Sequence, residues 1–359
     1  MKKKKVGIIG ATGMVGQRLL TLLDGHPYFE VTALAASARS AGQPYEAAVA
    51  GRWKLSAPIP AAYRAMPVTD AADIPTLRER CDFVFCAVNM GKGETKALEE
   101  DYARAEIPVV SNNSANRWTP DVPMVIPEIN AAHLAVIDTQ RKRLGTRRGF
   151  IAVKPNCSIQ SYVPALTPLL PWGIEQVVAT TYQAISGAGK TFREWREMVD
   201  NVIPYISGEE EKSEQEPLKI WGHVENGQIV KAAAPLITTQ CIRVPVSDGH
   251  TAAVFVKFRQ KPTRREILDA WSGFSGKPQQ LKLPHAPAQF LTYFGDDDRP
   301  QARLDRDLEG GMGISIGRLR EDAIFDYKFV GLSHNTLRGA AGGALLIAEL
   351  LYREGYLGG

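Results

Sequence analysis

Residues 6–16 read VGIIGATGMVG, and this segment decides the fold of the first part of the chain. The mostly apolar residues 6–10 predict a buried strand, and apolar residues at helical spacing over 17–23 predict a helix directly after it. Residues 31–35, VTALA, predict a second strand. The sequence therefore indicates a β-α-β unit with a glycine-rich turn between its first strand and its helix.

The turn carries glycine at its first, fourth and seventh positions. Glycine lets the backbone approach a pyrophosphate, which then lies at the N-terminus of the following helix. A tight strand-to-helix turn without a ligand has the same pattern, so the glycines alone leave both interpretations open. A strand before and a helix after form the context of a dinucleotide site. We expect the cofactor to contact this turn at Gly10, Thr12, Gly13, Met14, Val15 and Gly16.

The end of the second strand bears on which dinucleotide binds. An NAD-selective site usually has Asp or Glu there for the ribose 2′-hydroxyl, but this chain has residues 36–40, ASARS. A cation and hydroxyls suit a 2′-phosphate, so we expect NADP, with Ser37, Arg39 and Ser40 near that phosphate. A polar surface loop is the alternative. Asn89, after a strand predicted over 82–88, is also expected at the cofactor.

The order of predicted strands and helices differs between the first and second parts of the chain. Strands predicted over 82–88 and 108–111 flank a helix over 97–105, which makes residues 1–150 an α/β unit with a Rossmann-type, doubly wound parallel sheet. Residues 40–66 show no clear period and are expected as an irregular insertion. Later strands, predicted over 176–184, 241–246 and 251–259, come with fewer helices. They indicate an α+β domain with a mixed or antiparallel sheet.

Length and composition bound the function. A chain of 359 residues is long enough for two cores. The net charge of +4 comes from Lys2–Lys5, and the remaining 39 basic residues equal the 39 acidic ones, so we expect no nucleic-acid partner. No apolar stretch is long enough for a signal-peptide core or a membrane span. The four cysteines lack metal-type or disulfide-framework spacing, so we expect no metal and a cytoplasmic location.

Cys157 is the candidate nucleophile. It lies in residues 154–158, KPNCS, between a β-rich run (149–153) and an apolar, helix-like run (159–170). Asn156 is a good N-cap residue, which places Cys157 in the first helical turn, where free N–H groups and the helix dipole favour a thiolate. A small buried structural cysteine is the alternative. His250, after a strand and an Asp-Gly turn, is a candidate base.

Several motifs occur together and in order, over residues 7 to about 350. They are the glycine turn, PNCS (155–158), SGAG (186–189), NVIPY (201–205), EEEK (209–212), RVPVSDGH (243–250) and NTLRGAAG (335–342). Together they resemble the aspartate-β-semialdehyde dehydrogenase family, especially its archaeal and fungal-like branch. The combination is far more specific than any one motif.

The resemblance implies a role for each matched residue. Cys157 matches the nucleophile, His250 the general acid/base, and Gln183 the residue that positions the covalent intermediate. Arg243 matches the arginine that holds the substrate α-carboxylate. The remaining matches are Glu209 for the substrate ammonium (Glu210 and Glu211 being alternatives), Lys212 and Arg117 at the phosphate, and Ser186, Gly187 and Asn335 at the nicotinamide end. Asn116 is also expected to bind the substrate.

The resemblance also implies an activity and an organisation. The activity is the reversible, NADP-dependent reduction of L-aspartyl 4-phosphate to L-aspartate 4-semialdehyde through a cysteine thioester, in lysine, threonine and methionine biosynthesis. Its partners are the substrate and phosphate, without nucleic acid or membrane. The implied organisation is a discontinuous NADP domain (1–155 and 335–359), a catalytic and dimerisation domain (156–334), and a homodimer or homotetramer.

Two other functions compete with this one. A malonyl-CoA reductase or an N-acetylglutamyl-phosphate reductase-like enzyme would keep the fold and the cysteine. Arg243 with Glu209 favours a substrate that carries both a carboxylate and an ammonium group, which a malonyl group does not. A non-catalytic NADP sensor would normally lack the nucleophile or the base, and this chain has both.

Three residues depart from the family pattern. Lys154 stands where the family usually has asparagine, and it either lowers the pKa of Cys157 or faces solvent, the latter being our expectation. Pro164 is expected to kink the helix that follows Cys157. Lys190 replaces an aromatic residue that is frequent in archaeal-like members.

Overall fold

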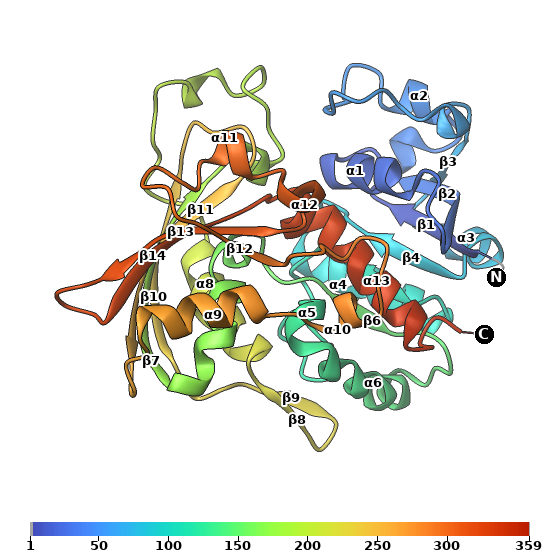
Figure 1. The fold of residues 1–359 in the computed structure, drawn as a ribbon. Coiled ribbons are helices and arrows are strands. Elements are labelled where there is room, and N and C mark those ends of the chain that lie inside the picture. Colours follow the sequence, from blue (N-terminus) through green and yellow to red (C-terminus); the bar gives the residue numbers. More distant parts are fainter. Residues whose placement is uncertain (1–2, 359) are drawn as a thin grey trace.

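The computed structural model describes residues 3–358, so Lys2 of the basic tail lies outside the described residues. Two six-stranded sheets stand side by side, the first at the right of Figure 1 and the second at its left. Within the described residues, no helix is both long and apolar enough to cross a bilayer.

The first sheet is parallel throughout, which confirms the predicted doubly wound unit. Its order is β3-β2-β1-β4-β5-β6, the order of a dinucleotide-binding sheet. Both faces of such a sheet are covered, and every residue of its fourth to sixth strands in this order is accordingly buried. The strands are β1 (Lys4–Ile9), β2 (Phe29–Ala36), β3 (Val68–Asp70), β4 (Phe83–Cys86), β5 (Val109–Ser111) and β6 (Ile151–Val153).

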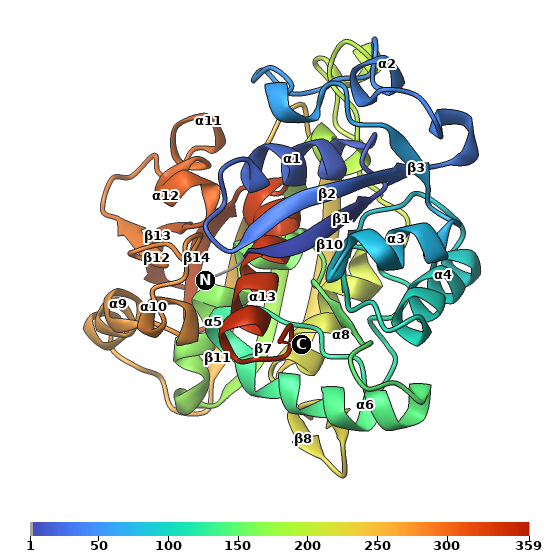
Figure 2. The ribbon, with the colours of Figure 1, turned by 90° about the vertical axis from the view of Figure 1, so that its right-hand side faces the viewer.

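Helices from both ends of the chain pack on this sheet. The last helix, α13 (Gly342–Arg353), is buried from Gly342 to Leu351 and shares a hydrophobic core with β1, β2 and α1. Figure 2 shows this red helix beside the blue N-terminal elements. We therefore propose the division into 1–155 with 335–359, and 156–334. The other helices here are α1 (Met14–Leu23), α2 (Tyr45–Ala48), α3 (Ile74–Arg80), α4 (Lys92–Arg104), α5 (Pro127–Asn130) and α6 (Ile137–Leu144).

The second sheet is mixed, as the sequence indicated. Its order is β10-β7-β11-β14-β13-β12, with parallel pairs at its two edges and antiparallel pairs between them. The strands are β7 (Ile174–Gln183), β10 (Leu236–Arg243), β11 (His250–Phe258), β12 (Leu291–Phe294), β13 (Ile314–Glu321) and β14 (Tyr327–Ser333); β8 (His223–Glu225) and β9 (Gln228–Val230) form a separate hairpin. The helices are α8 (Glu209–Ile220), α9 (Arg264–Gly273), α10 (Lys277–Gln280), α11 (Ala302–Asp305) and α12 (Leu308–Gly311).

Two local predictions are corrected. The apolar run after Cys157 is not one kinked helix: a 3₁₀ helix (Ser158–Ser161) ends at Tyr162, α7 (Val163–Leu166) follows, and a second 3₁₀ helix (Thr167–Trp172) completes it. Pro164 lies in the first turn of α7, where proline removes no helical hydrogen bond, so it starts a helix and does not bend one. The strand expected over 241–246 is β10, which begins at Leu236 and ends at Arg243.

Candidate active site

One cavity lies between the two sheets, at the carboxyl ends of the first sheet's strands. Ligands of open α/β sheets bind in this place. Segments far apart in the sequence contribute to its wall: the glycine turn, the loop after β5, the KPNCS segment, the start of α8 and the segment before α13. The lining includes Met14, Val15, Asn112, Arg117, Lys154, Asn156, Cys157, Ser186, Gly187, Glu209, Lys212 and Asn335.

The glycine turn fits a pyrophosphate. Gly10 has a φ of +88°, and a Cβ there would lie 2.4 Å from the Ala87 carbonyl oxygen. A Cβ on Gly16 would lie 2.4 Å from the Gly10 oxygen, so both glycines are needed to close the turn. Gly13 is the N-cap of α1 and has no side chain that could cap the helix. Met14 and Val15, which follow it, line the cavity. An anion can therefore take the N–H groups of this first helical turn.

Four other residues predicted at the cofactor lie outside the lining of this cavity. Ser37 and Arg39 are exposed beyond the end of β2, Asn89 is exposed after β4, and Ser40 is buried. Ser37 and Arg39 follow the end of β2 and are exposed, and their contact with a 2′-phosphate stays a prediction.

Cys157 is the N-cap of the 3₁₀ helix Ser158–Ser161 and does not lie inside a helical turn. Asn156 was predicted as the N-cap and instead precedes it, although its Oδ1 accepts a hydrogen bond from the Ser158 N–H at 2.7 Å. Desolvation, and then the nearby Glu209 carboxylate, raise the pKa of the Cys157 thiol above its ordinary value, although Lys154, Arg117 and Arg243 oppose them. The expected preference for thiolate is therefore wrong for the protein without ligands.

His250 contacts the sulfur directly. Its Nε2 lies 3.5 Å from Cys157 Sγ, and its Nδ1 accepts a hydrogen bond from the Ala184 N–H at 3.0 Å. Since Nδ1 is an acceptor, the neutral ring carries its proton on Nε2, facing the sulfur. Burial, and then the nearby Arg243, lower the pKa of His250 to about 3. At neutral pH the imidazole is therefore uncharged and donates a hydrogen bond towards the sulfur.

Glu209 is the glutamate of the run 209–211 that lines the cavity. Its carboxylate accepts from Asn156 Nδ2 at 3.0 Å, from Lys212 Nζ at 2.8 Å and from Gln183 Nε2 at 3.4 Å. Burial pushes the pKa of Glu209 upward, but Lys212 and these amides bring it below its ordinary value. Glu210 instead accepts from the Cys241 N–H, and Glu211 is exposed. The cavity thus holds a charged carboxylate with a nearby amide cradle.

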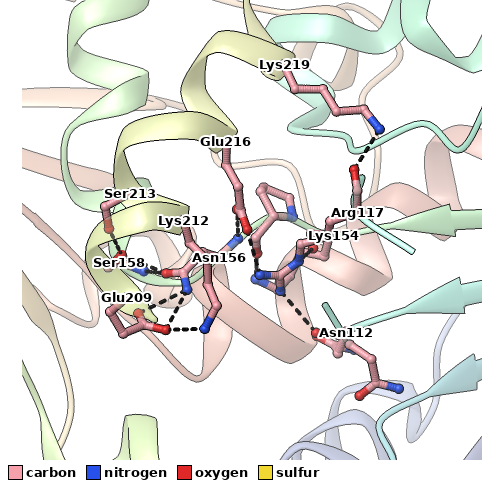
Figure 3. A network of polar contacts seen from close by, with 12 residues as sticks. Asn112, Arg117, Lys154, Asn156, Ser158, Glu209, Lys212, Ser213, Glu216 and Lys219 are labelled. Atoms are coloured by element: carbon pink, nitrogen blue, oxygen red, sulfur yellow. Dashed lines mark hydrogen bonds and ion pairs between the residues drawn. The ribbon is translucent and has the colours of Figure 1, made fainter. Parts of the chain in front are cut away.

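Arg117 is held by a second carboxylate (Figure 3). Its Nη1 lies 2.9 Å from Glu216 Oε1, and its Nε donates to the Lys154 carbonyl at 3.0 Å. The other oxygen of Glu216 accepts from the Asn156 N–H at 2.5 Å. Glu216 therefore joins the arginine to the loop of the nucleophile. Our sequence analysis did not single out Glu216, although its spacing of seven residues from Glu209 puts both on one face of α8.

Asn116 is not placed with the substrate groups. Its Nδ2 donates to Glu99 Oε2 at 2.7 Å, its Oδ1 accepts from the Thr119 hydroxyl, and the residue is fully buried outside the cavity lining. Its neighbour Asn112 does line the cavity. The prediction failed because a buried carboxylate, Glu99 on α4, takes the Asn116 amide.

Asn335 and Arg243 order the wall on the side of the second sheet. Asn335 accepts from the Gly249 N–H and donates to the Ser186 hydroxyl, both at 2.8 Å. Arg243 donates from Nη1 to the Ala184 carbonyl at 2.7 Å. These bonds fix the loop next to His250, so the two residues hold the base and the Ser186 turn together.

Replacing Gly187 by alanine should lower kcat/KM at least about 100-fold, because a Cβ there would lie 2.8 Å from Arg243 Nη1 and 3.1 Å from two ring atoms of His250. Gly189→Ala is the matched control in the same turn: its φ of +68° strains alanine, but a Cβ there meets nothing within 4 Å. Steady-state kinetics should show the loss only for Gly187→Ala. Equal losses in both variants would mean that backbone strain, and not crowding of His250, is responsible.

Two of the departures from the family pattern have clear positions. Lys154 is 3% exposed, so the expectation that it faces solvent is wrong. Lys190 is exposed, and its Nζ lies 4.3 Å from the centre of the Trp195 ring, a cation–π contact at the surface. Only Lys154 therefore bears on the site.

Known proteins resemble this chain over its whole length. Residues 5–137 match the family model "Semialdehyde dehydrogenase, NAD binding domain", and residues 166–338 match "Semialdehyde dehydrogenase, dimerisation domain". Aspartate-semialdehyde dehydrogenase of Methanothermobacter thermautotrophicus is 42% identical, over 96% of this chain and 98% of its own. The enzyme of Schizosaccharomyces pombe is 43% identical, over 99% of this chain and 100% of its own.

A solved structure gives the same answer for the fold. The crystal structure of aspartate-semialdehyde dehydrogenase with NADP from Candida albicans superimposes with a TM-score of 0.89 at 38% identity, covering 99% of this chain and 100% of that one. Sequence and fold therefore agree. The chain belongs to the aspartate-semialdehyde dehydrogenase family.

Proposed function

We propose that this protein reduces L-aspartyl 4-phosphate to L-aspartate 4-semialdehyde with NADPH, releasing phosphate, and that it catalyses the reverse reaction. The observation that carries the proposal is the Cys157–His250 pair, 3.5 Å apart, beside a cavity lined by both cations and a carboxylate. The matched relatives are aspartate-semialdehyde dehydrogenases, which act in amino-acid biosynthesis.

In the first step Cys157 attacks the acyl carbon. The Cys157 thiolate forms a C–S bond, the bond from that carbon to the phosphate oxygen breaks, and phosphate leaves, so that the acyl group remains on the sulfur as a thioester. Arg117 and Lys212 both line the cavity and supply the positive charge that a leaving phosphate requires. Glu216 keeps the Arg117 guanidinium directed to the cavity through its 2.9 Å ion pair.

In the second step the thioester becomes the aldehyde. Bound NADPH supplies the hydride to the thioester carbon. The Nε2–H of His250 is the donor available to the oxygen that becomes charged, and the Cys157 sulfur leaves again as a thiolate when the carbonyl re-forms. Gln183 is buried beside Glu209, which supports a role for it in holding the acyl group.

The charges of the site favour an amino-acid substrate. The Arg243 guanidinium suits an α-carboxylate, and the Glu209 carboxylate suits an ammonium group. A malonyl group has no ammonium to offer Glu209. We therefore propose that Arg243 and Glu209 select the aspartyl group between them.

Arg243→Lys should raise the KM for aspartate semialdehyde about 10- to 100-fold, because lysine cannot make two parallel hydrogen bonds to a carboxylate. The loss should fall on KM more than on kcat, which steady-state kinetics separates. The alkylation rate of Cys157 in the free protein is the control, and it should change little. An unchanged KM in this variant would show that Arg243 does not bind the α-carboxylate.

The matched dimerisation model covers the second sheet, whose outer face carries exposed apolar side chains. Tyr182 on β7 is 39% exposed and Leu236 on the neighbouring β10 is 73% exposed. We propose that this face joins two copies as a homodimer or as half of a homotetramer, in the cytoplasm, where thiols stay reduced. Sedimentation equilibrium tests the assembly, and a monomer at micromolar concentration would contradict it.

The assay that tests the function follows NADPH formation from aspartate semialdehyde with and without phosphate, and with NADP or NAD. We expect a phosphate-dependent rate that is higher with NADP. In the reductive direction, aspartyl phosphate should be used and malonyl-CoA should not. No phosphate-dependent rate, or a preference for malonyl-CoA, would overturn the proposal.

A further inference from the structure

Lys154 is a buried lysine for which the reaction described above has no use. It follows β6, is 3% exposed, and lines the same cavity as Cys157. Its Nζ donates to the carbonyl of the adjacent Pro155, a neutral acceptor. A buried ammonium normally requires an anionic partner, so the position calls for a negative charge nearby.

The segment before and within α13 shows that Lys154 and Cys157 are neighbours. A Cβ on Gly339 would lie 2.8 Å from Cys157 Cβ, and a Cβ on Gly343 would lie 3.4 Å from Lys154 Cδ. Gly339 lies in the π-helical turn 337–341 and Gly343 in the first turn of α13, so both belong to one continuous helical segment. The two glycines therefore let the nucleophile and the lysine stem pack side by side under this segment.

We propose that Lys154 is a positioning residue for the nucleophile, whose charge is coupled to the ionisation of Cys157 so that the thiolate forms beside an ammonium. When thiol and amine become thiolate and ammonium, the S–H bond breaks and an N–H bond forms at Nζ, so the pair keeps its number of protons. The inference rests on Cys157 being the nucleophile of the proposed function.

The surrounding charges agree with this coupling. Burial lowers the pKa of Lys154 to about 7, and Cys157 is one of the groups that raise it. Lys154 in turn lowers the pKa of Cys157. The other charged or titratable groups that act on the pair are Arg117 from the loop after β5, Glu209 and Glu216 from α8, Arg243 from β10, His250 from β11 and Arg338 from the segment before α13.

The test is the pH dependence of Cys157 alkylation by iodoacetamide in the full-length protein without substrate. Lys154→Met removes the charge, and Lys154→Gln also removes it but keeps an N–H donor for the Pro155 carbonyl. A nearby cation favours the thiolate, so both variants should move the inflection to higher pH by about one unit or more. Glu209→Gln removes an anion and should move it to lower pH.

The possible outcomes distinguish an effect of the Lys154 charge from an effect of its hydrogen bond or packing. An unshifted inflection in both lysine variants overturns the proposal, as does a rate lowered equally at every pH. A shift in Lys154→Met without one in Lys154→Gln assigns the effect to the Pro155 hydrogen bond and also overturns it. If Lys154→Met fails to fold, Lys154→Gln decides alone. Because no substrate is present, failure here leaves the phosphate-dependent assay, and so the proposed function, independently testable.

Discussion

Replacing Cys157 by serine should lower turnover about 10⁴-fold or more, since a hydroxyl at this site has no base strong enough to ionise it. The neutral His250 directs Nε2–H at the side chain and does not offer a free lone pair there. Steady-state rates in both directions measure the loss. NADP binding and circular dichroism should match those of the parent protein, because within residues 3–358 the Cys157 sulfur contacts only His250 Nε2 by a hydrogen bond.

Cys241→Ser is the matched control for the nucleophile. Cys241 is free like Cys157, but it is buried on β10 with its sulfur 3.6 Å from the Ser213 hydroxyl, away from the cavity lining. A serine there has a hydroxyl partner and should keep turnover within a few-fold. If Cys157→Ser kept more than about one hundredth of the activity, covalent catalysis at residue 157 would be ruled out.

Replacing Arg338 by methionine should lower the free energy of unfolding by about 3–5 kcal/mol, because it leaves a buried carboxylate without its partner. Arg338 is 1% exposed, and its Nη1 and Nη2 lie 2.8 Å and 2.5 Å from the two oxygens of the fully buried Glu128. Its Nε donates to Gln160, just after Cys157. The pair thus joins α5 and the nucleophile's helix to the segment before α13.

Chemical denaturation of Arg338→Met, Glu128→Gln and the double variant measures this pair. The double variant should recover part of the loss, since it no longer buries an unpaired charge. Activity should fall too, because residues 337–341 form a π-helical turn that covers Cys157 through Gly339. If Arg338→Met lowered the free energy of unfolding by less than about 1 kcal/mol, the Glu128 carboxylate would have another partner or water, which would contradict the prediction.

The parts of the fold that could be predicted are those that local sequence dictates. Residues 6–16 dictate a strand, a turn and a helix, and Gly10 and Gly16 are needed where the turn closes on backbone. The change from strand–helix alternation to repeated strands after Cys157 predicted a parallel sheet followed by a mixed one. The expected helix after Cys157 failed because apolar content alone does not distinguish one long helix from three short ones.

The site residues that could be predicted are those that a motif identifies without knowledge of the side chains they contact. Cys157, His250 and Glu209 were found from motif and position, and the structure brings them together. Asn116 and Lys154 were misplaced because their surroundings come from distant segments, Glu99 on α4 and the glycines near α13. Glu216 could have been predicted from the sequence, since its spacing of seven residues from Glu209 places both on one face of a helix.

The central claim is that an acyl group is carried on the Cys157 sulfur. Mixing the protein with aspartate semialdehyde and NADP in the absence of phosphate, and then digesting it for mass spectrometry, tests this most directly. We predict an aspartyl adduct on the peptide that contains Cys157, one NADPH formed per site, and loss of the adduct when phosphate is added. NADPH formation without an adduct on Cys157, or an adduct that phosphate does not release, would contradict the account.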